Sequence, residues 1–388
     1  MKDIAFIACY NDELLMNECR RYIERLYLPE DYRVDIITVF DAPSMCAGYN
    51  AAMKSTDAEI KIYLHQDSFI VNKYFLFNIV DIFNSDKNIG IIGITGTDGL
   101  PESAIWWDGN IKGKFPFTKE LYSDERIESA ASYSEAVVVD GFLIATSKDI
   151  DWREDIFDGF DFYDVSECME YRRRNYKVVV ADQKLPWCIH ADGFFMNLDN
   201  YLSARDKFFK EYAEDSFSID GVKAENKKER ESFLLDYELK KEFYNAFQTK
   251  FNNTISEKVK ISDYKGIFDH YIESINYLTE AGLANTLSAD FLRFMIIMDA
   301  YQREEAAGKK LFLQGVTDFK ELIKKFRKTE IYLRRLEYMA DDNDAKEEVF
   351  DFIRNEEISD YAIEEIMNSA VAQLGNLETI KNIIGQCR

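Results

Sequence analysis

The sequence predicts an α/β domain built on a mostly parallel sheet with flanking helices, followed by an all-α second domain. Over about the first 210 residues, short apolar runs alternate with amphipathic stretches of helical period. This alternation favours right-handed crossovers and therefore a parallel sheet. No proline follows Pro186, and long amphipathic stretches dominate from about residue 215. We therefore expect two domains, at residues 1–214 and 215–388.

The elements of the first domain follow from the same patterns. Buried strands are expected at residues 3–9, 33–40, 60–64, 89–95, 135–146 and 177–181. Helices are expected at residues 13–26, 75–84 and 165–174, and another opens at Gly48. The 135–146 segment is interpreted as a strand pair or as one strand broken at Asp140-Gly141. A glycine within a strand often marks a bulge or the close approach of a ligand.

Amphipathic stretches predict the helices of the second domain. They lie at roughly 225–250, 263–281, 288–306, 317–339, 344–355, 359–373 and 376–386. We find no repeat of fixed period among them. We expect this domain to form a homo-oligomer, to dock a partner or an acceptor, or to act as a lid.

Composition describes a folded, acidic chain. Its 388 residues are 47% hydrophobic, which is enough for sizeable cores. Lys plus Arg number 48 against 71 Asp plus Glu, so the net charge is −23. This charge repels polyanions, so we expect no nucleic-acid partner and no binding to anionic membranes. A small nucleotide is compatible, because a bound divalent metal locally reverses the sign of the field.

The cysteines and the hydropathy pattern give an expectation about the compartment. The six cysteines are scattered without a C-x-x-C pair, which disfavours a zinc cluster or a disulfide framework. The N-terminus enters a strand without the apolar region of a signal peptide, and no apolar run reaches the length of a transmembrane segment. We therefore expect a cytoplasmic protein.

Polar side chains follow two apolar runs at the point where each run ends. The strand at 60–64 leads into His65-Gln66-Asp67-Ser68, and a shorter run ends at His190. Ligands of open α/β sheets bind at the carboxyl ends of the strands. We therefore expect Asp67 to hold a metal or a charged substrate, with a helix cap or a turn as the alternative. Neither a G-x-G-x-x-G nor a P-loop motif is present, which disfavours dinucleotide and P-loop functions.

In its first half the sequence resembles family 2 glycosyltransferases of the GT-A fold, especially the subgroup of streptomycin-biosynthesis-like proteins. The resemblance depends on the order and spacing of short motifs between residue 3 and about residue 210. The motifs are 6–11, 41–44, 48–50, 64–67, 139–142, 157–164 and 189–190. It implies a GT-A-type domain that binds a nucleotide sugar. The helical half has no counterpart in the resemblance.

The resemblance assigns the nucleotide-sugar-binding residues. The loop after the first strand and the acidic residue after the second would hold the base and ribose; here these are Cys9, Tyr10, Asn11 and Asp41. Asn50 would flank the nucleotide from its helix.

Further contacts to the donor or the acceptor are implied for Gln66, Asp140 and Gly141. Trp106 and Trp107 would either stack on a sugar or pack in the core.

The resemblance also implies a metal site. The DxD motif of the family falls on His65-Gln66-Asp67, where only the last carboxylate is present. Asp67 would bind Mn²⁺ or Mg²⁺ together with His190, and the bound ion would neutralise the diphosphate leaving group. For His65, local packing is the alternative to ligation, and for His190 it is a structural hydrogen bond.

The catalytic base implied by the resemblance is Asp164, with Asp161 as the rival and Asp158 as a residue that could reach the acceptor. A carboxylate can take the proton of an acceptor hydroxyl, and an inverting displacement needs one such group. A helix N-cap just before Val165 is the competing interpretation of Asp164.

The function that we expect is a metal-dependent, inverting glycosyltransferase of the hexosyltransferase type. It would use a nucleotide-diphosphate sugar, first of all a UDP-sugar, and a glycan, protein or small-molecule acceptor. A catalytically degenerate GT-A scaffold that recruits partners through its helical domain is the alternative, because the DxD motif is incomplete. A nucleotidyltransferase is disfavoured, because no Gly- and Arg-rich phosphate loop follows the first strand.

Overall fold

The computed structural model of the chain describes most of the first half and part of the second. The described residues are 2–101, 104–114, 124–127, 132–191, 198–219, 245–246, 249, 319–355, 380 and 382–385. The chain divides into two compact units, Met1–Lys227 and Lys228–Arg388. Asp215 is ion-paired with Arg173 of the first unit at 2.8 Å. Residue 214, where the sequence analysis places the domain boundary, lies near the end of the first unit, and the boundary itself stays a prediction.

The first unit is organised around a mixed sheet of seven strands in the order β2-β1-β3-β10-β5-β11-β8. The strands are β1 Lys2–Tyr10, β2 Tyr32–Phe40, β3 Ile60–Leu64, β5 Ile89–Gly93, β8 Tyr133–Ala136, β10 Leu143–Thr146 and β11 Lys177–Ala181. β1 pairs in parallel with β2 and β3, and β5 pairs in parallel with β11. β10 is antiparallel to both of its neighbours, β3 and β5, and β8 is antiparallel to β11.

The described residues of the first unit also form two smaller sheets. β4 (Ser68–Ile70) pairs antiparallel with β12 (Cys188–His190). β6 (Thr95–Thr97) lies between β7 (Ile111–Gly113) and β9 (Val138–Val139). The predicted strand over 135–146 is thus split between β8, β9 and β10, and the chain leaves strand geometry at Asp140-Gly141 as the sequence suggested.

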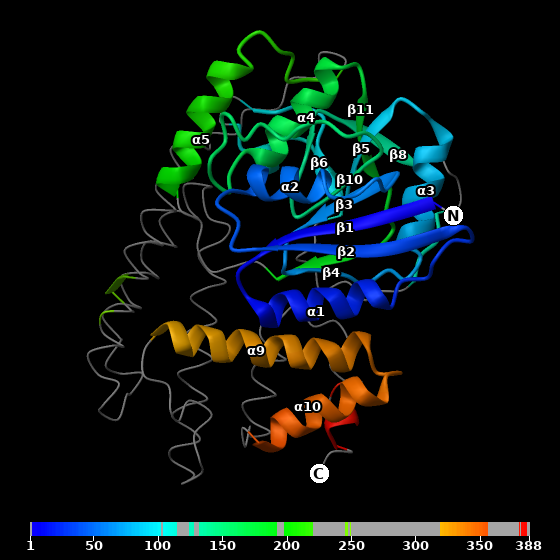
Figure 1. The fold of residues 1–388 in the computed structure, drawn as a ribbon. Coiled ribbons are helices and arrows are strands. Elements are labelled where there is room, and N and C mark those ends of the chain that lie inside the picture. The colour runs from blue at the N-terminus through cyan, green and yellow to red at the C-terminus, as the bar shows by residue number, and fades with distance from the viewer. Residues whose placement is uncertain are drawn as a thin grey trace. The chain divides into compact units, whose positions relative to one another are not determined.

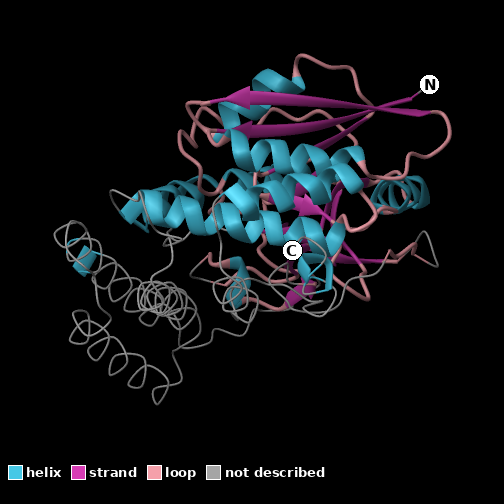
Figure 2. Cartoon of the chain, turned by 90° about the horizontal axis from the view of Figure 1, so that it is seen from below, coloured by secondary structure: helices cyan, strands magenta, loops and turns pink. Residues whose placement is uncertain are grey.

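Helices flank the sheets in both ribbon views (Figures 1 and 2). In the first unit they are α1 Glu13–Glu24, α2 Met45–Met53, α3 Phe75–Ser85, α4 Tyr163–Arg173, α5 Leu198–Glu211 and the short η1 Trp106–Asp108. Right-handed crossovers in opposite directions place α1 and α2 on opposite faces of the sheet. Asp12 caps α1 by accepting from Leu14 N and Leu15 N, and Ser44 caps α2.

The core beside α2 is aromatic. The Tyr49 ring packs 4.9 Å from both Tyr63 and Trp152, measured between centroids. Asn50 is only 3% exposed, and its amide donates to the Trp152 carbonyl and accepts from the Trp152 N–H, both at 2.8 Å. These two bonds join α2 to the segment after β10, so Asn50 is part of the packed wall of the domain.

Five cysteines lie buried as free thiols in the described part of the chain. They are Cys9, Cys19, Cys46, Cys168 and Cys188. Burial raises the pKa of Cys9 to about 12, and it also raises the pKa of the other four thiols well above the usual range. These cysteines behave as small apolar side chains.

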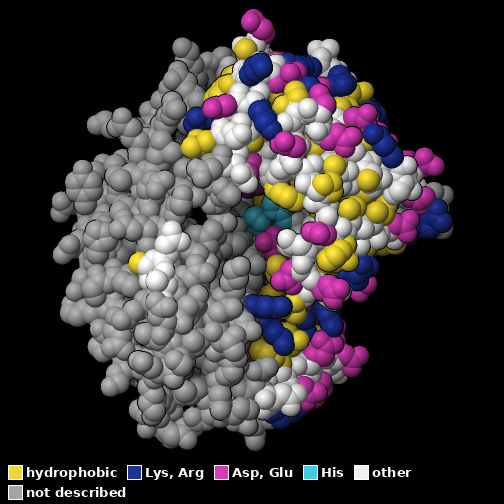
Figure 3. All heavy atoms as spheres, turned by 60° about the vertical axis from the view of Figure 1, so that its left-hand side comes forward, with side chains coloured by type: hydrophobic (Ala, Val, Ile, Leu, Met, Phe, Trp, Pro, Cys, Tyr) yellow, Lys and Arg dark blue, Asp and Glu magenta, His cyan; other side chains and the backbone are white. Residues whose placement is uncertain are grey.

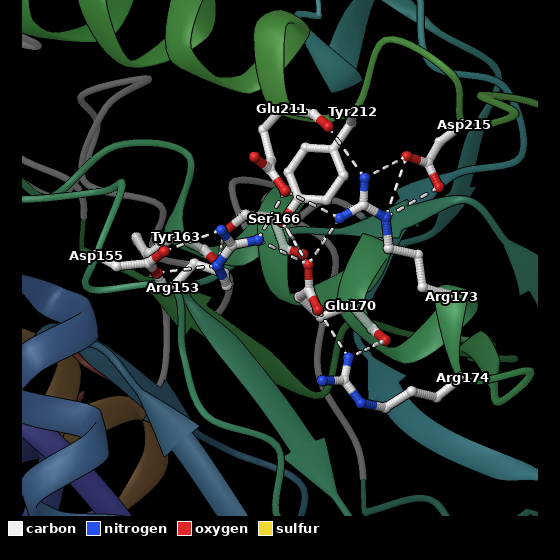
Figure 4. A network of polar contacts seen from close by, with 10 residues as sticks. All are labelled: Arg153, Asp155, Tyr163, Ser166, Glu170, Arg173, Arg174, Glu211, Tyr212 and Asp215. Carbon is white, nitrogen blue, oxygen red and sulfur yellow. Dashed lines mark hydrogen bonds and ion pairs between the residues drawn. The ribbon is translucent and has the colours of Figure 1, made fainter.

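A network of charged side chains joins α4 to the end of α5 (Figure 4). Its centre is Glu170, whose side chain is 7% exposed and accepts from Arg153, Arg173, Arg174 and Tyr212. Burial alone would raise the pKa of Glu170, but the bonds from Arg174, Tyr212 and Arg153 hold it below its usual range. The outer members of the network are Asp155, Glu211 and Asp215.

The described part of the second unit is helical. α9 (Phe319–Tyr338) and α10 (Asn343–Asn355) coincide with two of the predicted amphipathic stretches, 317–339 and 344–355. The other predicted helices of this unit lie wholly or mostly outside the described residues. Among the helices that the structure describes, none is long and apolar enough to cross a membrane.

We predict that Glu170→Ala lowers the free energy of unfolding by roughly 1–3 kcal/mol, because it removes the buried acceptor that Arg153, Arg173, Arg174 and Tyr212 share. Arg174→Ala is the matched control: its side chain is 49% exposed, so its ion pair with Glu170 contributes at most about 1 kcal/mol. Urea unfolding of both variants measures the difference. Equal losses would contradict the central place of Glu170.

Candidate metal and nucleotide-sugar site

The carboxyl end of β3 is fixed by the backbone that precedes β10. His65 N donates to the Phe142 carbonyl at 3.0 Å, and Ser68 Oγ donates to the same carbonyl at 2.8 Å. The ribbon of β4 and β12 places His190 opposite Ser68. Asp67 joins this arrangement through its carbonyl, which accepts from Ala191 N at 2.8 Å. Residues that are far apart in the sequence are thereby brought to one edge of the sheet.

Three potential metal ligands meet at this edge: His65, Asp67 and His190. One ligand atom from each lies within 4.8 Å of the other two. His190 Nε2 is 3.2 Å from His65 Nδ1 and 3.3 Å from Asp67 Oδ1. Histidine side chains reach the surface beside acidic side chains in the space-filling view (Figure 3). The structure thus unites the two predicted ligands and adds His65, for which the sequence left local packing as the alternative.

The chemistry of these three side chains fits a divalent ion. Burial, with a smaller contribution from His190, lowers the pKa of His65 to about 4. His65 is therefore a neutral imidazole at neutral pH, which is the form that binds metals. Asp67 supplies a carboxylate oxygen beside the two ring nitrogens. Separations near 3.3 Å between donor atoms match neighbouring ligands around one ion, at metal–ligand distances of about 2.1 Å.

Asp164 projects from the first turn of α4. The helix begins at Tyr163, and its N-cap residue is Phe162. Asp164 therefore lies inside the helix and is not its N-cap. Its carboxylate accepts from the Gly141 N–H at 2.8 Å. Burial, and then the nearby Asp140, raises the pKa of Asp164 to about 7. A carboxyl group with that pKa exchanges protons readily near neutral pH.

Gly141 is the point on which the first turn of α4 packs. A Cβ atom at this position would lie 2.1 Å from the Tyr163 hydroxyl and 2.8 Å from Asp164 Cβ. Only glycine leaves room for both residues. The Tyr163 hydroxyl passes this point and forms a short hydrogen bond with His65 Nε2. Gly141 therefore lies in contact with both the predicted base and the residue that bonds His65.

The other two carboxylates of the segment before α4 have different surroundings. Asp161 is half-buried, and burial raises its pKa to about 6. Asp158 is exposed and pairs with Lys207 at 2.6 Å. Of the two, Asp161 has the surroundings expected of a general base.

The loop after β1 is joined to the residue between His65 and Asp67. Gln66 Oε1 accepts from Asn11 N and Asp12 N, both at 2.9 Å, and Gln66 Nε2 donates to Asn11 Oδ1 at 2.9 Å. Gln66 therefore fixes the position of Asn11 next to the candidate metal ligands.

Aromatic and acidic side chains lie at the carboxyl ends of β1 and β2. Tyr10 and Phe40 meet edge to face with centroids 5.2 Å apart. Phe40 is 61% exposed, although it ends a strand. Asp41 is exposed and has a positive φ of 50°, and its N–H donates to the Tyr10 carbonyl at 2.8 Å. Phe40 was not a predicted site residue, although it directly precedes Asp41 in the sequence.

Three of the predicted residues, Cys9, Asn50 and Trp106, are buried inside the domain. Cys9 is buried against Gly48, where an added Cβ would lie 2.4 Å from its sulfur. Asn50 is held by Trp152, as described above. Trp106 is 5% exposed and packs edge to face with Trp107, which is the core-packing alternative for Trp106. Direct contact of Cys9 or Asn50 with a nucleotide stays a prediction.

A family comparison defines the class of protein. The model of the Glycosyltransferase like family matches residues 5–212, which is more than half of the chain. The chain belongs to this family. Membership confirms the resemblance to glycosyltransferases, and the mixed sheet with its flanking helices is the predicted GT-A-type fold. No curated protein matches the chain.

Several solved structures show a distant likeness. S. aureus TarS is 12% identical with a TM-score of 0.36, and the match covers 76% of this chain and 49% of TarS. TarS 1–349 in complex with UDP-GlcNAc is 12% identical with a TM-score of 0.34, and 79% and 88% of the two chains are covered. The mannosyltransferase PcManGT from Pyrobaculum calidifontis, in complex with GDP-Man and Mn²⁺, is 11% identical with a TM-score of 0.33 and coverages of 78% and 82%. The chain thus spans about half the length of full TarS.

We predict that Gly141→Ala destabilises the protein by about 1–3 kcal/mol, because the added methyl group forces Tyr163 and Asp164 away from their present positions. Gly159→Ala is the matched control, since nothing lies within 4 Å of a Cβ at that position. Urea unfolding measures both variants. A Gly141→Ala protein as stable as the control would show that the first turn of α4 shifts without cost.

Proposed function

We propose that the protein is an inverting, metal-dependent glycosyltransferase that moves a hexosyl group from a nucleotide-diphosphate sugar to an acceptor hydroxyl. The observation that carries this proposal is the connection between the two halves of the site. In the ligand cluster of His65, Asp67 and His190, His65 is hydrogen-bonded to the hydroxyl of Tyr163, and Tyr163 directly precedes Asp164 in the chain. Metal ligands and a carboxyl group of suitable pKa therefore share one rigid frame.

The chemistry assigned to each residue follows from this geometry. Asp164 takes the proton of the acceptor hydroxyl as the oxygen attacks the anomeric carbon from the side opposite the diphosphate. The Gly141 N–H stabilises the ionised form of Asp164. A divalent ion bound by the cluster, Mn²⁺ or Mg²⁺, would neutralise the charge that develops on the departing diphosphate. One carboxylate base is sufficient for a single displacement with inversion.

The nucleotide is assigned to the ends of β1 and β2. Tyr10 and Phe40 offer aromatic surface, Asn11 offers an amide held by Gln66, and Asp41 offers a carboxylate for the ribose hydroxyls. We propose a UDP-sugar as the donor and a glycan, protein or small molecule as the acceptor. Within the family we place the chain beside the streptomycin-biosynthesis-like subgroup on its motif order, and in the cytoplasm on its free thiols.

A catalytically degenerate scaffold is the second candidate, favoured by the histidine at the first position of the DxD motif. A panel of UDP-, GDP- and dTDP-sugars, each with and without Mn²⁺, separates the two functions. We expect one donor to raise the melting temperature in the presence of Mn²⁺ and to be hydrolysed slowly. No shift and no hydrolysis with any donor would favour the scaffold.

We predict that kcat/KM for transfer rises with pH through a midpoint near 7, because Asp164 must be ionised to act as the base and its pKa is about 7. Activity falls about tenfold for each pH unit below the midpoint and is level above it. A carboxyl group with its usual pKa near 4 would give a flat profile over the same range. Steady-state rates between pH 5 and 9 at saturating metal provide the measurement.

Two variants assign that midpoint to a residue. Asp164→Asn retains the acceptor oxygen for Gly141 but cannot take a proton, so transfer should be lost while nucleotide binding persists. The Asn variant should also be more stable than the native protein above pH 7. Because the pKa of Asp164 is raised in the folded protein, the folded state binds this proton more tightly than the unfolded chain, and that stabilisation is lost as the pH rises through about 7. A midpoint near 6 that disappears in Asp161→Asn would instead make Asp161 the base.

A further inference from the structure

The ligand cluster is rich in nitrogen. Two of its three protein ligands are imidazoles, His65 and His190, and only Asp67 contributes oxygen. His190 Nε2 lies between the other two donor atoms, at 3.2 Å and 3.3 Å. Magnesium prefers an all-oxygen environment and gives up its waters reluctantly, whereas imidazole suits the first-row transition metals.

Tyr163 determines which nitrogen of His65 faces the cluster. The Tyr163 hydroxyl bonds Nε2, while Nδ1 points to His190. If Nε2 carries the proton and donates to the Tyr163 oxygen, Nδ1 keeps its lone pair free for a metal. Ligating histidines usually have such a partner on their second nitrogen, and loss of the partner lowers metal affinity by about 10–100-fold.

The orientation of Tyr163 is itself fixed. Its ring is buried and packs edge to face with Tyr49 at 5.9 Å, and its hydroxyl passes over Gly141. The hydroxyl therefore has little freedom to leave His65. A rigid second partner of this kind makes His65 a preorganised ligand rather than an incidental neighbour.

We propose that His65, whose Nδ1 is turned toward the cluster by the bond between Nε2 and the Tyr163 hydroxyl, is the third protein ligand, and that the site selects first-row transition dications over Mg²⁺. The inference rests on the proposed function, because the same ion would contact the donor diphosphate. Tyr163 acts as a positioning residue through His65.

The test is binding of the metal alone to the full chain. Isothermal titration calorimetry should show that Co²⁺ binds most tightly, Mn²⁺ less tightly and Mg²⁺ most weakly. The affinity for Mn²⁺ should be on the order of tenfold higher than that for Mg²⁺. Bound Co²⁺ should show the visible absorption of a nitrogen-ligated ion. His65→Asp replaces a nitrogen with an oxygen and should narrow the gap between Mn²⁺ and Mg²⁺.

Tyr163→Phe should weaken Co²⁺ binding by roughly 10–100-fold while leaving the melting temperature of the metal-free protein close to that of the native protein. Tyr171→Phe is the matched control: this buried tyrosine lies on the same helix, and its hydroxyl donates to the Lys148 carbonyl instead. It should leave the metal affinity unchanged.

Mg²⁺ binding as tight as Mn²⁺ binding, or a His65→Asp variant with unaltered selectivity, would overturn the proposal. So would equal effects of the two tyrosine variants on Co²⁺ affinity. These results are independent of transfer activity. A chain that selects transition metals but transfers no sugar would contradict the proposed function alone, and a chain that transfers sugar without this selectivity would contradict the inference alone.

Discussion

The contact between the first turn of α4 and the bare backbone of Gly141 is the constraint on which the site depends. Because no side chain intervenes, Asp164 can accept from the Gly141 N–H, and the Tyr163 hydroxyl can reach His65. One close approach therefore sets the position of the proposed base and the orientation of a proposed metal ligand. A displacement of this turn would alter both together.

The reversed direction of β10 brings that constraint to the right edge of the sheet. β10 lies antiparallel between β3 and β5, so the residues before it, not after it, lie at the carboxyl end of β3. This is why Asp140, Gly141 and Phe142 adjoin His65, whose N–H donates to the Phe142 carbonyl. In an all-parallel sheet the same loop would lie at the opposite edge.

Sequence patterns predicted the strands of the main sheet, the helices α1 to α4 and the polar strand end at His65-Gln66-Asp67, because these features are local; α5 was not among the predicted helices. They did not predict that His65 approaches His190, since this depends on the pairing of β4 with β12, more than 100 residues away in the chain. They left Asp164 with a capping alternative because the start of α4 was placed two residues too late. Asn50 was correctly placed on its helix, but its bonds to Trp152 depend on a distant segment.

The burial of the five cysteines has a consequence for handling the protein. Alkylating reagents attack thiolates, and burial keeps these sulfurs protonated at neutral pH. Modification of Cys9, Cys19, Cys46, Cys168 or Cys188 therefore requires the surrounding structure to open first. The rate at which a thiol reagent labels these positions therefore measures local unfolding of the first unit, and no engineered probe is needed.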